Sequence, residues 1–361
     1  MNDSELDRAL ALQERADALA SEGDAAGAEA ALRESIALFE AMDGPESPDV
    51  ANLLRLLGGA MIAQGRYQEA ADCAARAIAI MDKVLPLMEG PEGPQILVEA
   101  LAVEGTALRE AGLYPKAEPV LRRAIAVCES ELPFEKAMLA NALNNFGMLC
   151  KYNGNFEEGA QAYERAMGLA IEEAGEMSSM VAVLNHNIGG LEHSRGNYAA
   201  AEGPARRAWE IRRELLKDDV HLDVHADACA YGGVLDGLGR HAESKAIYEK
   251  ALIAYEEHYG PVHFEVAATL NNLASAESGL GDTGAAIRHG QRALDIKRQL
   301  LGEDHPEWAL TANNLAMLLF EVGKRDEAVS LLQRAAHTVQ QRLDEGHPIR
   351  LRIEENLASL L

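Results

Sequence analysis

The segment TLNNLASAESGLG at residues 269–281 recurs 42 residues later as TANNLAMLLFEVG at 311–323. Both copies space their apolar residues three and four apart and end on a glycine, which is the pattern of one face of an α-helix that stops at a turn. Apolar residues resume at helical spacing after the glycine, at Ile287, Ala293 and Leu294. We therefore expect each copy to begin a helical hairpin with glycine at its turn.

The turn glycine marks the same hairpin along the whole chain. Glycines stand 42, 47, 42, 42, 43, 42 and 42 residues apart, at Gly23, Gly65, Gly112, Gly154, Gly196, Gly239, Gly281 and Gly323. Small residues recur seven positions before, and five and twelve positions after, each of these glycines. Small side chains let two helices approach closely, and a period of this length predicts a solenoid of stacked hairpins.

Composition and charge narrow the possible functions. Of 361 residues, 48% are hydrophobic and only 5% aromatic, which favours packed helices over sheets. The 33 basic and 58 acidic side chains give a net charge of -25, which argues against binding to nucleic acid or to a membrane surface and favours a basic or neutral protein segment as partner. The acidic N-terminus and the lack of a long apolar run predict a soluble, cytoplasmic protein. The four cysteines lack zinc-ligand spacing, and we expect no metal or cofactor.

The two quoted segments, followed by RALDIKRQLLGEDHPEWA at 292–309, resemble the tetratricopeptide repeat in the 42-residue form of kinesin light chains and of many stand-alone bacterial repeat proteins. The resemblance implies an all-α, right-handed α-solenoid of about eight hairpins plus a C-terminal capping helix. The first helix of each hairpin would line a concave groove. The expected single solenoid covers 1–361, with repeats at 6–49, 50–95, 96–137, 138–180, 181–222, 223–265, 266–307 and 308–349 and the capping helix at 350–361.

Two irregularities interrupt this pattern. The 47-residue spacing arises at PLMEGPEGPQ (86–95), where Pro and Gly predict an extended connection that either interrupts the stacking or protrudes as a loop. The first 49 residues hold 3 basic and 13 acidic side chains. They form either a solvated cap or an acidic docking arm.

Two rows of residues on the first helices are candidate peptide-binding sites. In the resembling family, the position nine residues before the turn glycine bonds the backbone of a bound peptide, and here it holds Asn145, Asn187, Asn272, Asn314 and, in the capping helix, Asn356. The alternative is that these amides satisfy neighbouring helices. The position three residues before the glycine varies and would select among ligands, unless it is ordinary solvated surface; it holds Arg109, Lys151, His193, Asp236 and Ser278.

Histidines offer the main alternatives to a binding role. His221, His263, His305 and His347 lie 42 residues apart at the connection between hairpins, which spreads them too widely to share a metal ion and favours a structural role in each loop. A general acid–base pair could be assembled from His186, His193, Glu192 and Asp236. No nucleophile motif or cofactor fingerprint accompanies them, so we expect no catalysis.

The function that the sequence favours is that of a non-catalytic scaffold or adaptor, which binds a protein or an extended peptide in its groove. The first alternative is a peptide-sensing regulator whose superhelical pitch changes on ligand binding. An enzyme with a site in the groove is the less favoured alternative. The sequence determines neither the identity of the partner nor the oligomeric state.

Overall fold

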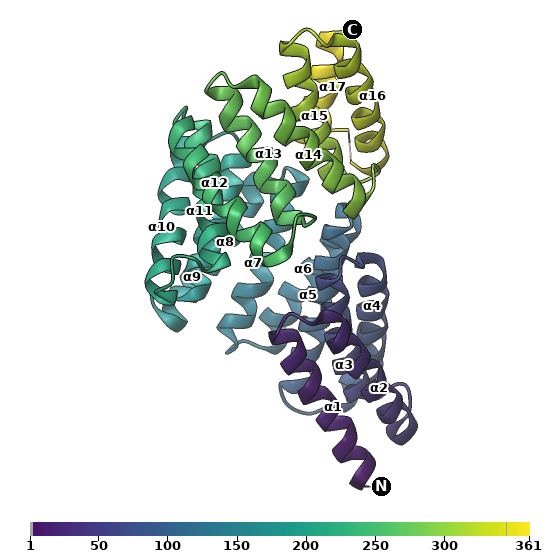
Figure 1. Ribbon diagram of the computed structural model, residues 1–361. Coiled ribbons are helices and arrows are strands. Elements are labelled where there is room, and N and C mark those ends of the chain that lie inside the picture. The colour runs from purple at the N-terminus through teal and green to yellow at the C-terminus, as the bar shows by residue number, and fades with distance from the viewer. Residues whose placement is uncertain (1–2, 344) are drawn as a thin grey trace. The chain divides into compact units, whose positions relative to one another are not determined.

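The computed structural model describes residues 3–343 and 345–361, and these residues form α-helices joined by short turns (Figure 1). Residues 1–2 and 344, which the predicted solenoid and its eighth repeat include, lie outside the described residues. The chain divides into two compact units, Met1–Leu149 and Cys150–Leu361. That the two form one continuous solenoid over 1–361, with the repeat limits given above, stays a prediction.

Unit 1 consists of antiparallel helical hairpins in which each helix packs on the next. Its helices are α1 (Asp3–Ser21), α2 (Ala25–Asp43), α3 (Pro48–Ala63), α4 (Tyr67–Val84), α5 (Glu92–Glu110) and α6 (Tyr114–Glu131), with a 3₁₀ turn η1 (Leu85–Leu87) after α4. The boundary between the units falls inside α7 (Lys136–Asn153). Direct packing of α3 on α5 joins the first helices of two consecutive hairpins.

Unit 2 continues the same alternation of first and second helices. Its helices are α8 (Phe156–Ala174), α9 (Ser179–Ser194), α10 (Tyr198–Leu216), α11 (Leu222–Gly237), α12 (His241–Tyr259), α13 (Phe264–Gly279), α14 (Thr283–Leu301), α15 (Pro306–Glu321), α16 (Arg325–Arg342) and α17 (Pro348–Leu360). The first helices α9, α11, α13, α15 and α17 also pack on one another in order, whereas the described second helices make at most marginal contact among themselves. In a curved stack, the helices on the inner side are closer together than those on the outer side. The first helices, which contact one another, therefore form the concave layer of unit 2. The predicted all-α solenoid of hairpins is confirmed.

The turn glycines and the small residues have the roles that their spacing predicts. All eight turn glycines have φ between +72° and +83°, a conformation that disfavours every residue with a Cβ. A Cβ added to Gly105 would lie 2.4 Å from Leu121 on the partner helix. Ala293, twelve residues after its turn glycine, is fully buried beside Ala251 and Leu270. The small residues therefore mark the contacts where two helices approach most closely.

The periodic histidines cap helices. In His221, His263, His305 and His347 the ring Nδ1 accepts a hydrogen bond from the backbone N–H two residues later, over 3.1–3.2 Å. These bonds satisfy an amide at the start of α11, α13, α15 and α17 that has no partner within its helix. Ser47 and Ser178 cap α3 and α9 through Oγ, which accepts from the backbone N–H three residues later. The predicted structural role of the histidines in the loops is confirmed.

The connection at 86–95 is shorter than its Pro and Gly content predicts. α5 begins at Glu92 and includes Pro94 in its first turn, where the missing N–H of proline leaves no helical bond unmade. α4 packs on α5, so the stacking is not interrupted. The part that protrudes is η1, where Leu87 is 84% exposed.

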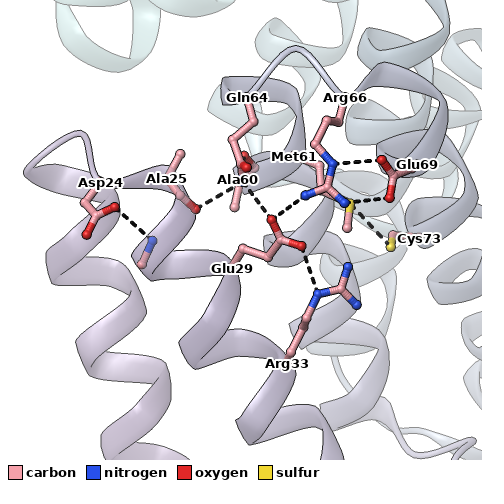
Figure 2. A network of polar contacts seen from close by, with 11 residues as sticks. Asp24, Ala25, Glu29, Arg33, Ala60, Met61, Gln64, Arg66, Glu69 and Cys73 are labelled. Atoms are coloured by element: carbon pink, nitrogen blue, oxygen red, sulfur yellow. Dashed lines mark hydrogen bonds and ion pairs between the residues drawn. The ribbon is translucent and has the colours of Figure 1, made fainter.

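The acidic first hairpin is tied to the second by ion pairs. Glu29 of α2 accepts hydrogen bonds from Gln64 (2.9 Å), Arg66 (2.5 Å) and Arg33 (2.9 Å), as Figure 2 shows. Burial opposes the charge of Glu29, but these bonds and the charge of Arg66 outweigh it and lower the pKa of its carboxyl. Further along the same pair of hairpins, Glu40 pairs with Arg76 and Glu46 with Lys83. Part of the N-terminal acidic charge therefore holds the second hairpin in place.

Candidate functional site

Five asparagine side chains form one continuous chain of hydrogen bonds across α13, α15 and α17. Asn356 donates from Nδ2 to Asn313 Oδ1 (2.8 Å), and Asn313 donates to Asn314 Oδ1 (3.3 Å). Asn314 then donates to Asn271 Oδ1 (3.2 Å), and Asn271 donates to Asn272 Oδ1 (3.3 Å). Turning any one interior amide would place like atoms against each other on both sides, so the five amides orient one another.

This chain brings together three members of the predicted asparagine row, Asn272, Asn314 and Asn356, each half-buried on the concave layer. It does not include the other two, since Asn187 lies on α9 and Asn145 on α7 in unit 1. The equivalent residues of α11 are Cys229 and Ala230. Neither residue has a side-chain amide, so the asparagine row is interrupted at α11.

The repeat pattern did not predict Asn271 and Asn313 as site residues. Each directly precedes a member of the predicted row, and Asn313 is only 3% exposed. Each links the row residue of its own helix to the row residue of the next hairpin. The Asn-Asn pair in both quoted segments could have indicated them. The first asparagine of each pair accepts the hydrogen bond from the row asparagine of the next hairpin.

The variable row, three residues before each turn glycine, also reaches the next first helix. Lys151 Nζ lies 3.3 Å, and His193 Nε2 3.5 Å, from the positions where a Cβ would stand on Gly190 and Gly233. Asp236 accepts a hydrogen bond from Ser275 over 2.6 Å. In unit 1, Arg109 likewise reaches Met148 Sδ (3.4 Å). Its guanidinium is paired with Glu110 (2.6 Å) and only 6% exposed.

These contacts leave the members of the variable row unequally available to a ligand. Lys151, His193, Asp236 and Ser278 are half-buried on the concave side, whereas Arg109 is enclosed. Burial lowers the pKa of His193, and the charge of Lys151 lowers it further, so its imidazole is held neutral near pH 7. The positive charge of Arg352 on α17 also lowers the pKa of His193. The surface is polar with both signs of charge.

The groups named for a possible acid–base pair are engaged with separate partners. His186 Nδ1 lies 2.7 Å from Asp227, and Glu192 accepts from Asn197 over 3.0 Å. Asp236 lies 2.6 Å from His241 Nδ1. The four groups therefore form no mutual pair in the geometry that proton transfer requires.

Within residues 3–343 and 345–361, no three His, Cys, Asp or Glu side chains gather as metal ligands do. Over the same residues, no helix combines the length and apolar character needed to cross a membrane.

Comparison with known proteins places the repeats in a family. The tetratricopeptide repeat model matches residues 7–83, 138–214, 227–299 and 285–336. The protein Kinesin Light Chain-Related 3 of Arabidopsis thaliana is 24% identical over 261 residues, which are 69% of this chain and 37% of that protein. The chain thus spans little more than a third of that relative's length.

Solved structures share the fold at low identity. BtubC (BKLC) from P. vanneervenii has a TM-score of 0.52 at 21% identity, over 65% of this chain and 92% of its own. A Rap protein complexed with competence and sporulation factor has a TM-score of 0.61 at 14% identity, over 98% of both chains. NprR in complex with its cognate peptide NprX has a TM-score of 0.56 at 15% identity, over 81% of this chain and 80% of its own. With the family model matching most of its length, this chain belongs to the tetratricopeptide repeat family.

Proposed function

We propose that the protein is a non-catalytic adaptor that binds an extended peptide, or a peptide-like segment of a protein, along the first helices of unit 2. The observation that carries the proposal is the chain of asparagine amides. An interior amide such as Asn314 uses one N–H and one lone pair within the chain. It keeps a second N–H and a second lone pair, which a peptide backbone can bond without regard to sequence.

Asn272 ends the chain of amides, and its Nδ2 donates to no other member of the chain. Its Oδ1 accepts from Asn271. The preceding first helix, α11, has Cys229 at the position where an asparagine acceptor would stand, and a thiol is a weak acceptor. We therefore place a peptide carbonyl at Asn272 Nδ2. The neighbouring variable row, with Lys151, His193, Asp236 and Ser278, would then discriminate among the side chains of the ligand.

Charge and relatives support the same class of ligand. At a net charge of -25 the protein attracts basic or neutral segments and repels nucleic acid and anionic membranes. The Rap and NprR structures, which share this fold, were each solved with a bound factor or peptide. A cytoplasmic location is part of the proposal.

The proposal is tested with a displayed library of random twelve-residue peptides, selected on the purified protein. Binding of each selected peptide is then measured for wild type, for Asn272→Ala and for Gln291→Ala, an exposed amide on the second helix α14. We expect Asn272→Ala to weaken binding about tenfold, which corresponds to about 1.4 kcal/mol, and Gln291→Ala to leave it unchanged. Failure to select any peptide, or equal affinities for all three proteins, would contradict the proposal.

A peptide-sensing regulator is the second candidate, and one contact favours it. The end of α7 meets the start of α17, where His347 Nε2 contacts the carbonyl of Tyr152 and Pro348 packs against Gly154. A ligand that changed the pitch of unit 2 would open or tighten this contact. Small-angle X-ray scattering with and without a selected peptide separates the two, since a regulator changes its radius of gyration and a static adaptor does not.

A further inference from the structure

A cavity of about 320 Å³ lies between α8 and α9. Its walls are mainly apolar, and they come from the second helix of one hairpin and the first helix of the next. Tyr163 and Leu191 are almost fully buried in these walls, and Met167 and Ile188 are half-buried. Its walls include Tyr163, Met167, Ile188 and Leu191, and its carboxylates are those of Glu164 and Glu192.

The next pair of hairpins fills the equivalent place with its own aromatic rings. One repeat later, Trp209 and Tyr231 stand at the positions of Met167 and Ile188. Their rings stack with centroids 6.0 Å apart and an interplanar angle of 26°. They pack with Ala205, Val234 and Leu235 in one core cluster. This position in the repeat therefore suits an indole ring packed against the neighbouring helix.

We propose that the α8–α9 cavity is a docking pocket for an aromatic side chain of a partner protein, carried on a segment with basic residues beside the aromatic one. The cavity is large enough, because about 150 Å³ already accommodates a benzene molecule. Met167 suits such a pocket, since its flexible, polarizable side chain adapts to an entering ring. An aromatic side chain in an apolar pocket is also the usual anchor of a protein interface.

The charge at the pocket selects the flanking residues. At the equivalent positions of Glu164 and Glu192, the α10–α11 interface has Arg206 and Leu235. The acidic lining is therefore specific to the α8–α9 interface. Arg195 lies 3.7 Å from Glu192. It is also paired with Glu157, which leaves three carboxylates to one guanidinium. A Lys or Arg next to the docked ring would face this excess of negative charge, much as Arg213 lies over Trp209 at 5.1 Å in the next repeat.

The pocket is separate from the asparagine chain on α13, α15 and α17, so this proposal does not rest on the proposed peptide groove. The probes are three fluorescein-labelled nine-residue peptides on a Gly-Ser frame, with Lys-Trp-Lys, Glu-Trp-Glu or Lys-Ala-Lys at the centre. Fluorescence anisotropy measures their dissociation constants with the full chain. We expect Lys-Trp-Lys to bind at least tenfold more tightly than either control peptide.

Two sets of variants locate the site. Met167→Trp places an indole where the next repeat has one, fills the cavity and should weaken binding of the Lys-Trp-Lys peptide at least tenfold while the helical circular dichroism is retained. Glu164→Gln with Glu192→Gln should weaken binding at least threefold and reduce its dependence on salt. Because this double variant alters only the acidic lining, it tests the site even if Met167→Trp fails to fold. As the matched control, Glu210→Gln changes an exposed carboxylate on α10 and should have no effect.

Three results would overturn the proposal. The first is equal binding of the Lys-Trp-Lys and Glu-Trp-Glu peptides, because the carboxylates would then select nothing. The second is unchanged binding by both sets of variants, because the peptide would then lie elsewhere. The third is a wild-type dimer in light scattering that Met167→Trp converts to a monomer, because the occupant of the pocket would then be a second copy of this chain.

Discussion

Asn356 on α17 donates from Nδ2 to Oδ1 of Asn313 on α15 over 2.8 Å, and the accepting side chain is 3% exposed. The last helix is thus held to the last hairpin by a polar bond as well as by the apolar contact of the fully buried Ile353. A buried amide that loses its partner is still desolvated, which costs free energy. Any other position of α17 that broke this bond would therefore be less stable. The chain of amides therefore stabilises the end of unit 2 as well as orienting the proposed groove.

Asn313→Ala should lower the free energy of unfolding by about 1–3 kcal/mol, because it leaves Asn314 Oδ1 and Asn356 Nδ2 without their partners. Urea denaturation followed by circular dichroism measures the effect. Glu355→Ala, at an exposed position beside Asn356, is the control and should change stability by less than about 0.5 kcal/mol. Equal losses in the two variants would show that the amide chain adds nothing to stability.

The histidine caps should be replaceable by serine. His305→Ala removes the bond from Glu307 N–H to Nδ1, which measures 3.1 Å, and should cost about 0.5–2 kcal/mol. His305→Ser should recover most of this loss, because Ser47 and Ser178 make the same kind of cap with Oγ. Thermal unfolding of the three proteins checks the prediction. A serine variant no more stable than the alanine variant would contradict the capping role.

Stability should fall as the solution is acidified through the titration range of the histidines. Burial lowers the pKa of His263, and the charge of His258 lowers it further. The side chain also stacks on Tyr259 with centroids 3.9 Å apart. A base whose folded pKa is depressed takes up its proton more readily when unfolded, so its contribution is complete above the unfolded pKa of about 6.5 and is lost as pH falls through the folded pKa.

His263→Ser should therefore flatten the dependence of stability on pH below about 6.5 while keeping the cap. Urea midpoints at several pH values, for wild type and variant, provide the measurement. His337→Ser is the control, because His337 lies on the second helix α16 and caps no helix. Identical pH profiles for wild type and His263→Ser would rule out this histidine as a source of the pH dependence.

The sequence predicted the features that depend on one residue type at one repeat position. A left-handed turn requires glycine, and a close helix contact requires a small residue, so Gly281 and Ala293 could be located from spacing alone. Partners across hairpins were harder to predict, because Asn313 acts only through its distance from Asn314 and Asn356 in the folded chain. The cavity beside Met167 was not predicted, since it depends on how the side chains of α8 and α9 pack in the folded chain. The connection at 86–95 was predicted too long, because Pro94 is compatible with the first turn of α5.

A pair of glycine substitutions should change stability in opposite directions. Gly281→Ala places a Cβ on a residue with φ +83° and should cost about 1–2 kcal/mol, although no atom lies within 4 Å of the new methyl group. Gly59→Ala lies in an ordinary turn of α3 with the same open space and should stabilise by about 0.5–1 kcal/mol. Chemical denaturation of both variants decides the point. Changes of the same sign would show that backbone conformation is not what selects glycine at the turns.

Glu29 should contribute stability that acid removes. Its carboxylate, 13% exposed, accepts from Arg33, Gln64 and Arg66, and these partners outweigh burial and lower its pKa. A carboxyl with a depressed folded pKa contributes fully above its unfolded value, about 4.3, and loses that contribution as pH falls through the folded value. Glu29→Gln should therefore destabilise the protein by about 1.5–3 kcal/mol at pH 7, by weakening charge-assisted bonds, and by much less near pH 3. Glu22→Gln, at an exposed position in the turn between α1 and α2, should have little effect on stability at either pH. If Glu29→Gln lowered the free energy of unfolding equally at pH 7 and near pH 3, the loss would come from packing and not from the charge of Glu29.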